Sequence, residues 1–296
     1  MTDPTAAPVR TAIVLGGGGI AGIAWEVGLL SRLLELGVPL DDADLVVGTS
    51  AGSVVGTVLR SGLVAEGYLE QLEPAPGTPE GSFDTAAFEA AVATVLHGAG
   101  DQEDARARLG ALARQVPLTG PEPELVTAMR ERFGAEAPWP ARDLAVCTVD
   151  ATTGAFRVLT RDSGVPLHVA VAASCSVPLV WPTVDVDGSP TMDGGVRSGT
   201  NADVADAADR VLVLSCGPEL PASPLGPTLP QVVAARRAAG CPVHVVEADA
   251  ASLAAFGGQS LSAASRRPSA EAGRRQADEV VDAVRAFWAG DAASGS

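Results

Sequence analysis

The sequence predicts an α/β fold with a mainly parallel sheet, and three features indicate it. A strand–helix–strand unit opens the chain, with an apolar strand at 11–15, a helical pattern at 20–36 and a second strand at 45–47. Glycine-rich turns follow both strands of this unit. Apolar runs return at 210–215 and 242–246, as expected of buried parallel strands. The β-α-β order implies parallel strands joined by a right-handed crossover.

The composition indicates a globular chain with an acidic surface. Of its 296 residues, 47% are hydrophobic and 19% are charged, and the net charge is −16. Nucleic-acid binding needs clustered Lys and Arg, so nucleic acid is not an expected partner. The same charge disfavours electrostatic docking on anionic membranes, although peripheral membrane contact stays open. The simplest explanation of the net charge is that it keeps the protein soluble. The sequence leaves the oligomeric state open.

No targeting or membrane-spanning segment is expected. Residues 1–9 have neither the basic nor the apolar region of a signal peptide. The longest apolar stretch, 165–181, is interrupted by His168 and Pro178 and is too short to span a bilayer. Widely spaced cysteines without a Cys-x-x-Cys motif predict reduced thiols of a cytoplasmic protein rather than disulfides or a metal site. They are Cys147, Cys175, Cys216 and Cys241.

The stretch Gly48-Thr49-Ser50-Ala51-Gly52 lies between the second strand and a helical pattern at 53–59. Gly-x-Ser-x-Gly in that setting is typical of a nucleophile elbow, in which a strained turn exposes the serine. Small neighbours would let substrate approach, and the helix N-terminus below Ser50 would favour an anionic intermediate. The alternative is a Gly/Ser-rich turn without chemical function.

The glycine run that follows the first strand allows two interpretations. Gly17-x-Gly19-x-x-Gly22 matches a dinucleotide fingerprint. That fingerprint also requires an acid at the end of the second strand, where this chain has Gly48. The other interpretation is an oxyanion hole, because glycines at a helix N-terminus leave backbone N–H groups approachable. Both turns follow adjacent parallel strands, so the run and Ser50 are expected to face one crevice. No P-loop sequence is present.

Residues 61–140 differ from the flanking sequence because helical patterns alternate there with breakers. Patterns at 83–97, 103–116 and 125–133 predict a helical insertion that could cap the crevice. Its larger apolar side chains are candidates for an acyl pocket, or are simply core-facing helix residues. They are Phe83, Phe88, Leu96, Met129 and Phe133.

Strands at 144–149 and 155–159 and a helix at 166–174 are expected next. Asp187-Gly188 is a hairpin turn signal. Asp193 lies past the hairpin, before Gly194 and Gly195, and on spacing alone is a turn residue or a catalytic acid.

The C-terminal part is expected to contain two more helices. A helical pattern at 229–239 connects the two late strands, and an amphipathic pattern follows at 271–288. Residues 248–268 are expected to be mostly loop. No domain boundary is evident, so 1–296 is treated as one domain.

Three motifs in this order resemble the patatin-like phospholipase family. They are Gly17-Gly18-Gly19-Ile20-Ala21-Gly22, Gly48-Thr49-Ser50-Ala51-Gly52 and Asp193-Gly194-Gly195, and the stretch Ala172–Pro178 is also similar. The resemblance covers roughly 12–208, which would be the catalytic core. It implies a three-layer α/β/α sandwich, with 61–140 as a helical insertion or cap and 209–290 completing the sandwich.

The resemblance also implies a lipid acyl hydrolase with a Ser–Asp dyad. Ser50 would be the nucleophile and Asp193 its base, and Gly17, Gly18 and Gly19 would supply oxyanion donors. The substrate would be a lipid or acyl ester, and no metal or cofactor would be needed.

One departure from the family keeps other functions open. The family's glycine loop usually has Arg or Lys before its last glycine, where this chain has Ala21, which weakens the expectation of a phosphate-bearing substrate. A non-catalytic lipid-binding protein is therefore one alternative, and a nucleotide-binding oxidoreductase is another. A Ser–His–Asp triad is a third, but no histidine is well placed for it. The candidates are His97 near a helix end, His168 in an apolar helix and His244 within a strand.

Overall fold

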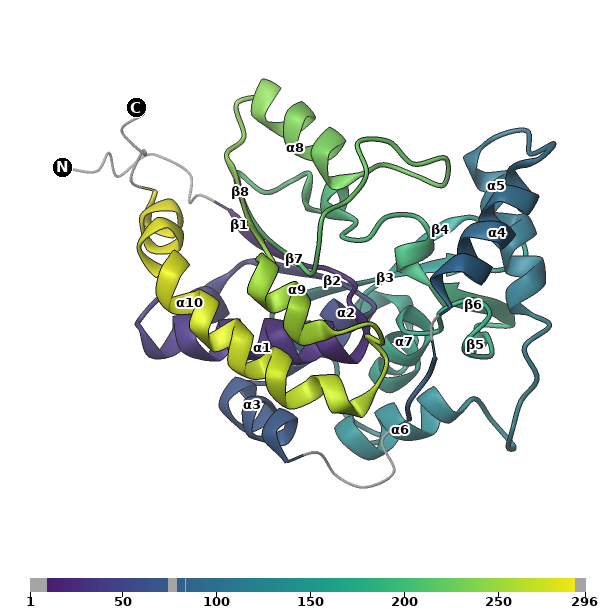
Figure 1. Ribbon diagram of the computed structural model, residues 1–296, viewed down its shortest axis with the longest axis horizontal. Coiled ribbons are helices and arrows are strands. Elements are labelled where there is room, and N and C mark those ends of the chain that lie inside the picture. Colours follow the sequence, from purple (N-terminus) through teal and green to yellow (C-terminus); the bar gives the residue numbers. More distant parts are fainter. Residues whose placement is uncertain (1–9, 74–78, 83, 291–296) are drawn as a thin grey trace.

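The computed structural model describes residues 10–73, 79–82 and 84–290, and these residues form an eight-stranded sheet (Figure 1). Its strand order is β5-β6-β3-β2-β1-β7-β8, with β4 paired to β3. The strands are β1 Thr11–Leu15, β2 Leu45–Thr49, β3 Asp143–Asp150, β4 Phe156–Leu159, β5 Val184–Val186, β6 Ser189–Asp193, β7 Arg210–Ser215 and β8 Val243–Glu247.

The sheet has a parallel part and an antiparallel part. Strands β3, β2, β1, β7 and β8 pair in parallel, whereas β4 and β6 pair antiparallel to β3. In the parallel part, Leu15 lies opposite both Gly48 and Leu214. The carboxyl ends of β1 and β2 therefore meet at one edge. The predicted mainly parallel sheet is confirmed.

Helices cover both faces of the sheet, which confirms the three-layer α/β/α sandwich. Alternation along β1 explains how one strand serves both layers: Ile13 and Leu15 face one core, and Ala12 and Val14 face the other. The first layer contains α1 Gly19–Glu35, α2 Ala51–Arg60, α3 Val64–Leu72, α7 Leu167–Ser174, α9 Ala250–Phe256 and α10 Arg266–Ala289. The second contains the 3-10 helix η4 Ala202–Ala205 and α8 Leu229–Ala238.

The predicted insertion is helical, but its helices lie in separate places. Helix α3 packs against α1 and α10, and α6 Glu124–Phe133 packs against α7. Helices α4 Thr85–Leu96 and α5 Gln102–Ala113 pair with each other at the antiparallel end of the sheet (Figure 1). Their buried Leu109 packs with Met192 of β6.

The prediction that residues 248–268 are mostly loop is wrong in part. It contains α9, whose first turn is capped by the Asp249 side chain, which accepts a hydrogen bond from the Ser252 N–H at 2.7 Å. It also contains the start of α10 at Arg266. Proline at the third position of a helix is tolerated because its missing N–H has no partner there anyway, so Pro268 does not delay the helix. Among the described residues, no helix has both the length and the apolar composition that a membrane crossing requires.

Helices α1 and α10 cross in close contact because each has a glycine at the crossing. A Cβ atom on Gly28 would lie 2.2 Å from the Ala270 carbonyl oxygen, and one on Gly273 would lie 2.2 Å from that of Trp25. The Trp25 indole N–H donates to Gln276 Oε1 at 3.1 Å across the same interface. The glycines thus set the distance between the two helices.

Replacing Gly28 by alanine should destabilise the protein. The added methyl group would force α1 and α10 apart, and overpacking of this kind costs about 1–3 kcal/mol, although alanine favours a helix more than glycine. Urea unfolding measures the change. Gly258→Ala is the matched control, because a Cβ atom there meets nothing within 4 Å. A Gly28→Ala midpoint at or above the wild-type midpoint would contradict this packing.

Candidate active site

Ser50 occupies a strained turn between β2 and α2. Its backbone has φ 53° and ψ −117°, a conformation that residues with a side chain rarely adopt. Hydrogen bonds hold the turn. The Ser50 N–H donates to Ser174 Oγ at 2.9 Å, and the Ser174 hydroxyl donates to the Cys147 carbonyl at 2.8 Å. The Ser50 carbonyl accepts from the Ser53 hydroxyl at 2.7 Å and from the Cys175 thiol at 3.4 Å.

The glycines on either side of Ser50 are required by backbone packing. A Cβ atom on Gly52 would lie 2.0 Å from the Leu15 carbonyl oxygen, and one on Gly48 would lie 2.5 Å from the Gly52 carbonyl oxygen. The strand-turn-helix context predicted from the sequence is therefore present. Its physical reason is different: these glycines make room for the chain itself, not for a substrate.

Asp193 lies beside Ser50 although the two are far apart in sequence. Strand β6 ends at Asp193, and β3 separates it from β2 in the sheet. One Asp193 carboxylate oxygen, Oδ1, accepts from the Gly195 N–H at 2.7 Å, and the Ser50 side chain lies close enough to interact with the carboxylate. The Asp193 N–H donates to the Ser176 carbonyl at 3.0 Å. The fold thus brings the predicted pair together.

The Asp193 carboxylate is nearly enclosed, with 4% of its surface exposed. Burial raises its pKa to about 7, while the interactions with the Ser50 side chain and with the Gly195 N–H oppose this shift. A carboxylate with a pKa near 7 is a stronger base than an ordinary aspartate, whose pKa is about 4. Near neutral pH it can therefore accept a proton from a hydroxyl group.

One of the three predicted oxyanion donors in the glycine loop is not available. The Gly17 N–H donates to the Gly199 carbonyl at 2.8 Å, so it is not free to bind an oxyanion. Within the described part of the chain, the N–H groups of Gly18 and Gly19 have no acceptor, and neither does that of Ala51. The sequence analysis missed Ala51, although the residue that follows the nucleophile of such an elbow is a known oxyanion donor.

A buried acid supports the glycine loop from below. Glu26 of α1 is fully buried, and its Oε1 accepts from the Gly16 N–H at 2.9 Å. The Gly16 N–H also donates to the Leu214 carbonyl of β7 at 3.0 Å. Burial raises the pKa of Glu26 well above its usual range. The loop is thus anchored both to α1 and to β7.

The remaining motif glycines serve close packing around the site. A Cβ atom on Gly22 would lie 2.9 Å from Cys216 Sγ, and one on Gly194 would lie 2.4 Å from the Cys147 carbonyl oxygen. Gly195 holds the Asp193 carboxylate through its N–H. All four cysteines have free thiols.

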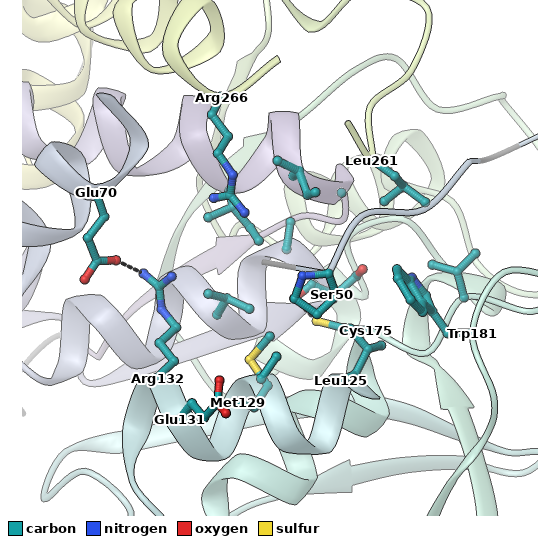
Figure 2. Close-up of a pocket in the computed structure, with 18 of the residues that line it drawn as sticks. Ser50, Glu70, Leu125, Met129, Glu131, Arg132, Cys175, Trp181, Leu261 and Arg266 are labelled. Atoms are coloured by element: carbon teal, nitrogen blue, oxygen red, sulfur yellow. Dashed lines mark hydrogen bonds and ion pairs between the residues drawn. The ribbon is translucent and has the colours of Figure 1, made fainter. Parts of the chain in front are cut away.

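A cavity of about 460 Å³ opens above Ser50 (Figure 2). Apolar side chains line most of it, among them Ile20, Ile23, Val54 and Leu125 from three helices and Trp181 from the segment after α7. Gly19 and Ala51 also lie in its wall. The cavity therefore presents an apolar surface beside a serine and two unbonded backbone N–H groups.

The candidate acyl-pocket residues from 61–140 have different positions. Met129 of α6 lines the cavity. Phe88 and Leu96 pack in the separate cluster around α5, and Phe133 packs against the main core. Phe83 lies outside the described residues.

Charged side chains also line the cavity, and the sequence analysis did not predict them. Arg132 of α6 donates to Glu70 of α3 at 2.5 Å, and Arg266 begins α10 (Figure 2). These residues come from three separate helices, so no local motif connects them. Ala21, by contrast, is fully buried.

None of the three histidines lies in the cavity wall formed by the described residues. His97 follows the last residue of α4, and His168 is buried in α7. His244 in β8 stacks with Phe287, with ring centroids 5.3 Å apart. A triad in which one of them assists Ser50 has no support in this arrangement.

The chain matches one family model and has similar solved structures. The model of patatin-like phospholipases matches residues 13–206. VipD from Legionella pneumophila is 14% identical with a TM-score of 0.48, over 94% of this chain and 68% of VipD. The type III effector protein ExoU is 16% identical with a TM-score of 0.44, over 95% of this chain and 54% of ExoU. The chain thus spans about half the length of ExoU. No curated protein sequence matches it.

The buried Asp193 should make folding stability depend on pH. Its folded pKa of about 7 exceeds the unfolded value of about 4, so the folded state holds a proton that the unfolded chain releases. Stability from this group is fully present below pH 4 and is lost as pH rises to 7. Asp193→Asn does not titrate, so it does not lose stability in this way. The unfolding free energy of the variant minus that of wild type should therefore rise with pH between 4 and 7, by up to about 1.4 kcal/mol per pH unit.

Urea unfolding of both proteins at pH 5 and pH 8 tests this expectation. Taking the difference between variant and wild type cancels the other titrating groups. An equal difference at both pH values would show that the Asp193 pKa is not raised in the folded state.

Proposed function

Because the chain belongs to the patatin-like phospholipase family, we propose that it is a serine acyl-ester hydrolase with Ser50 and Asp193 as its catalytic dyad. The observation that carries the proposal is the position of the Ser50 side chain, which lies beside the buried Asp193 carboxylate and lines an apolar cavity. The substrate is a lipid or another acyl ester, consistent with the apolar wall.

In the proposed reaction, Ser50 Oγ attacks the ester carbonyl carbon while its proton passes to Asp193. The carbonyl oxygen becomes an oxyanion, which the N–H groups of Gly18, Gly19 and Ala51 stabilise. The tetrahedral intermediate collapses, and the proton on Asp193 passes to the departing alcohol. Water then attacks the acyl-enzyme with Asp193 again as base, which releases the acid and restores Ser50.

The strained turn at Ser50 favours this chemistry. It places Oγ at the tip of the elbow, at the start of α2, whose positive dipole end faces the forming oxyanion. The Ser50 backbone N–H is already bonded to Ser174, so it is not a donor for substrate. The next N–H, that of Ala51, is the free one.

Ser50→Ala should abolish hydrolysis of p-nitrophenyl butyrate and labelling by a fluorophosphonate probe, because it removes the attacking oxygen. Asp193→Asn should lose nearly all activity, since asparagine keeps the hydrogen bonds but cannot accept the proton. Ser61→Ala, at the exposed far end of α2, is the matched control and should react like wild type. Failure of wild type to label would favour a non-catalytic lipid-binding protein, the alternative suggested by Ala21.

The rate should rise with pH through about 7 and then level off, because Asp193 acts as a base only when ionised. A histidine base would give a limb in the same range, so variants decide between them. His97→Gln, His168→Gln and His244→Gln should each keep most activity. If any one of these variants is folded yet as inactive as Ser50→Ala, that histidine is catalytic and the site is a triad rather than a dyad.

A further inference from the structure

Arg266 is a buried cation in the cavity wall whose bonded partner is neutral. Its residue surface is 5% exposed, and its Nη1 donates to the Gln71 amide oxygen at 2.8 Å. Its Nε is enclosed without a hydrogen-bond partner. Among the described residues, no acceptor is found for its Nη2 either. The described residues thus use only part of the hydrogen-bonding capacity of this guanidinium.

A cation in such a position is costly unless an anion compensates for it. Burial, followed by the charge of Arg132, lowers the pKa of Arg266. Both effects disfavour its charged form, and both would be relieved by an anion between the two guanidinium groups. Charge-assisted hydrogen bonds from arginine to phosphate or carboxylate are among the strongest in proteins.

The carboxylates around Arg266 do not neutralise it directly. Glu70 and Glu80 interact with its charge, but each has another partner. Glu70 accepts from Arg132 at 2.5 Å, and Glu80 accepts from the Ala263 N–H at 2.7 Å. Glu73 and Glu131 also line the cavity, where both are exposed to solvent. Water screens these exposed charges more strongly than the buried one.

The position of Arg266 relates it to the serine. Arg266, Arg132 and Ser50 line the same cavity, and Figure 2 shows both guanidinium groups directed into it from α10 and α6. Apolar side chains such as Ile23 and Met129 line the same cavity. The cavity thus offers an apolar surface and a cationic site to one ligand.

We propose that Arg266, with Arg132, binds the anionic head of an amphiphilic ester while Ser50 attacks its acyl carbonyl. The inference rests on the proposed hydrolase function and narrows its substrate class to esters that carry a phosphate or carboxylate. Arg266 then determines specificity: it distinguishes an anionic ester from a neutral ester with the same acyl chain. It is not needed for the chemical step itself.

Two esters that differ in a single group test the proposal. Wild type should hydrolyse 1-dodecanoylglycerol 3-phosphate with a higher kcat/KM than 1-dodecanoylglycerol. Arg266→Gln should lower kcat/KM for the phosphate ester about 10- to 100-fold, the range expected for a hydrogen bond to a charged group, and leave the neutral ester unchanged. Arg267→Gln is the matched control, because Arg267 is its exposed neighbour on α10 and should affect neither ester. An equal loss on both esters, or no loss on either, would overturn the proposal.

A binding experiment separates this inference from the catalytic proposal. Calorimetry with Ser50→Ala protein and dodecyl phosphate, dodecanoate or dodecanol needs no turnover. Tighter binding of either anion than of dodecanol, reduced in Ser50→Ala/Arg266→Gln, supports the anion site, and the tighter anion identifies the head group. Equal binding of all three refutes it. If wild type hydrolyses no ester yet binds dodecyl phosphate in this way, the catalytic proposal fails and the anion site stands. If Arg266→Gln does not fold, the comparison of the three ligands in Ser50→Ala still decides.

Discussion

The site depends on one backbone constraint, the positive φ angle of Ser50 at the end of β2. A serine stays in that conformation because its neighbours leave no alternative: Ser174 accepts from its N–H, Ser53 donates to its carbonyl, and Gly52 lies against Leu15 of β1. The turn is thus fixed by two strands and two helices together. Strain of this kind persists when the surrounding structure over-determines it. The same contacts leave the Ser50 Oγ at the tip of the turn, beside the Asp193 carboxylate.

Local patterns were enough to predict the elements to which the proposed reaction is assigned. The elbow at Ser50, the β-α-β unit and the loop at Asp193 are short motifs whose spacing follows from the strand and helix repeats. The prediction was wrong about the Gly17 donor, because the Gly17 N–H already donates to the carbonyl of Gly199, which lies far along the chain. The charge in the cavity was missed for the same reason. The hydrogen bond from Arg266 to Gln71 joins residues that are far apart in the sequence, so no local sequence pattern could predict it.

The segment beyond the family match contributes directly to the site. Strand β7 pairs with β1, and its Leu214 carbonyl accepts from the Gly16 N–H at the start of the glycine loop. Helix α10 packs along α1 through Gly28 and Gly273 and places Arg266 in the cavity wall. Residues 13–206 contain the proposed dyad and the free N–H groups. The later elements hold the glycine loop in place and supply one wall of the cavity.

This division has a consequence for a chain that is still being synthesised. Proteins leave the ribosome N-terminus first, at about 5–20 residues per second. Ser50 emerges early, whereas Gly199, Leu214 and Arg266 follow after most of the chain has been made. Until then the glycine loop lacks two of its backbone acceptors and the cavity lacks a wall. A nascent chain therefore exposes the serine before the surrounding site is complete, and the proposed ester cleavage has to wait for the elements that follow residue 206.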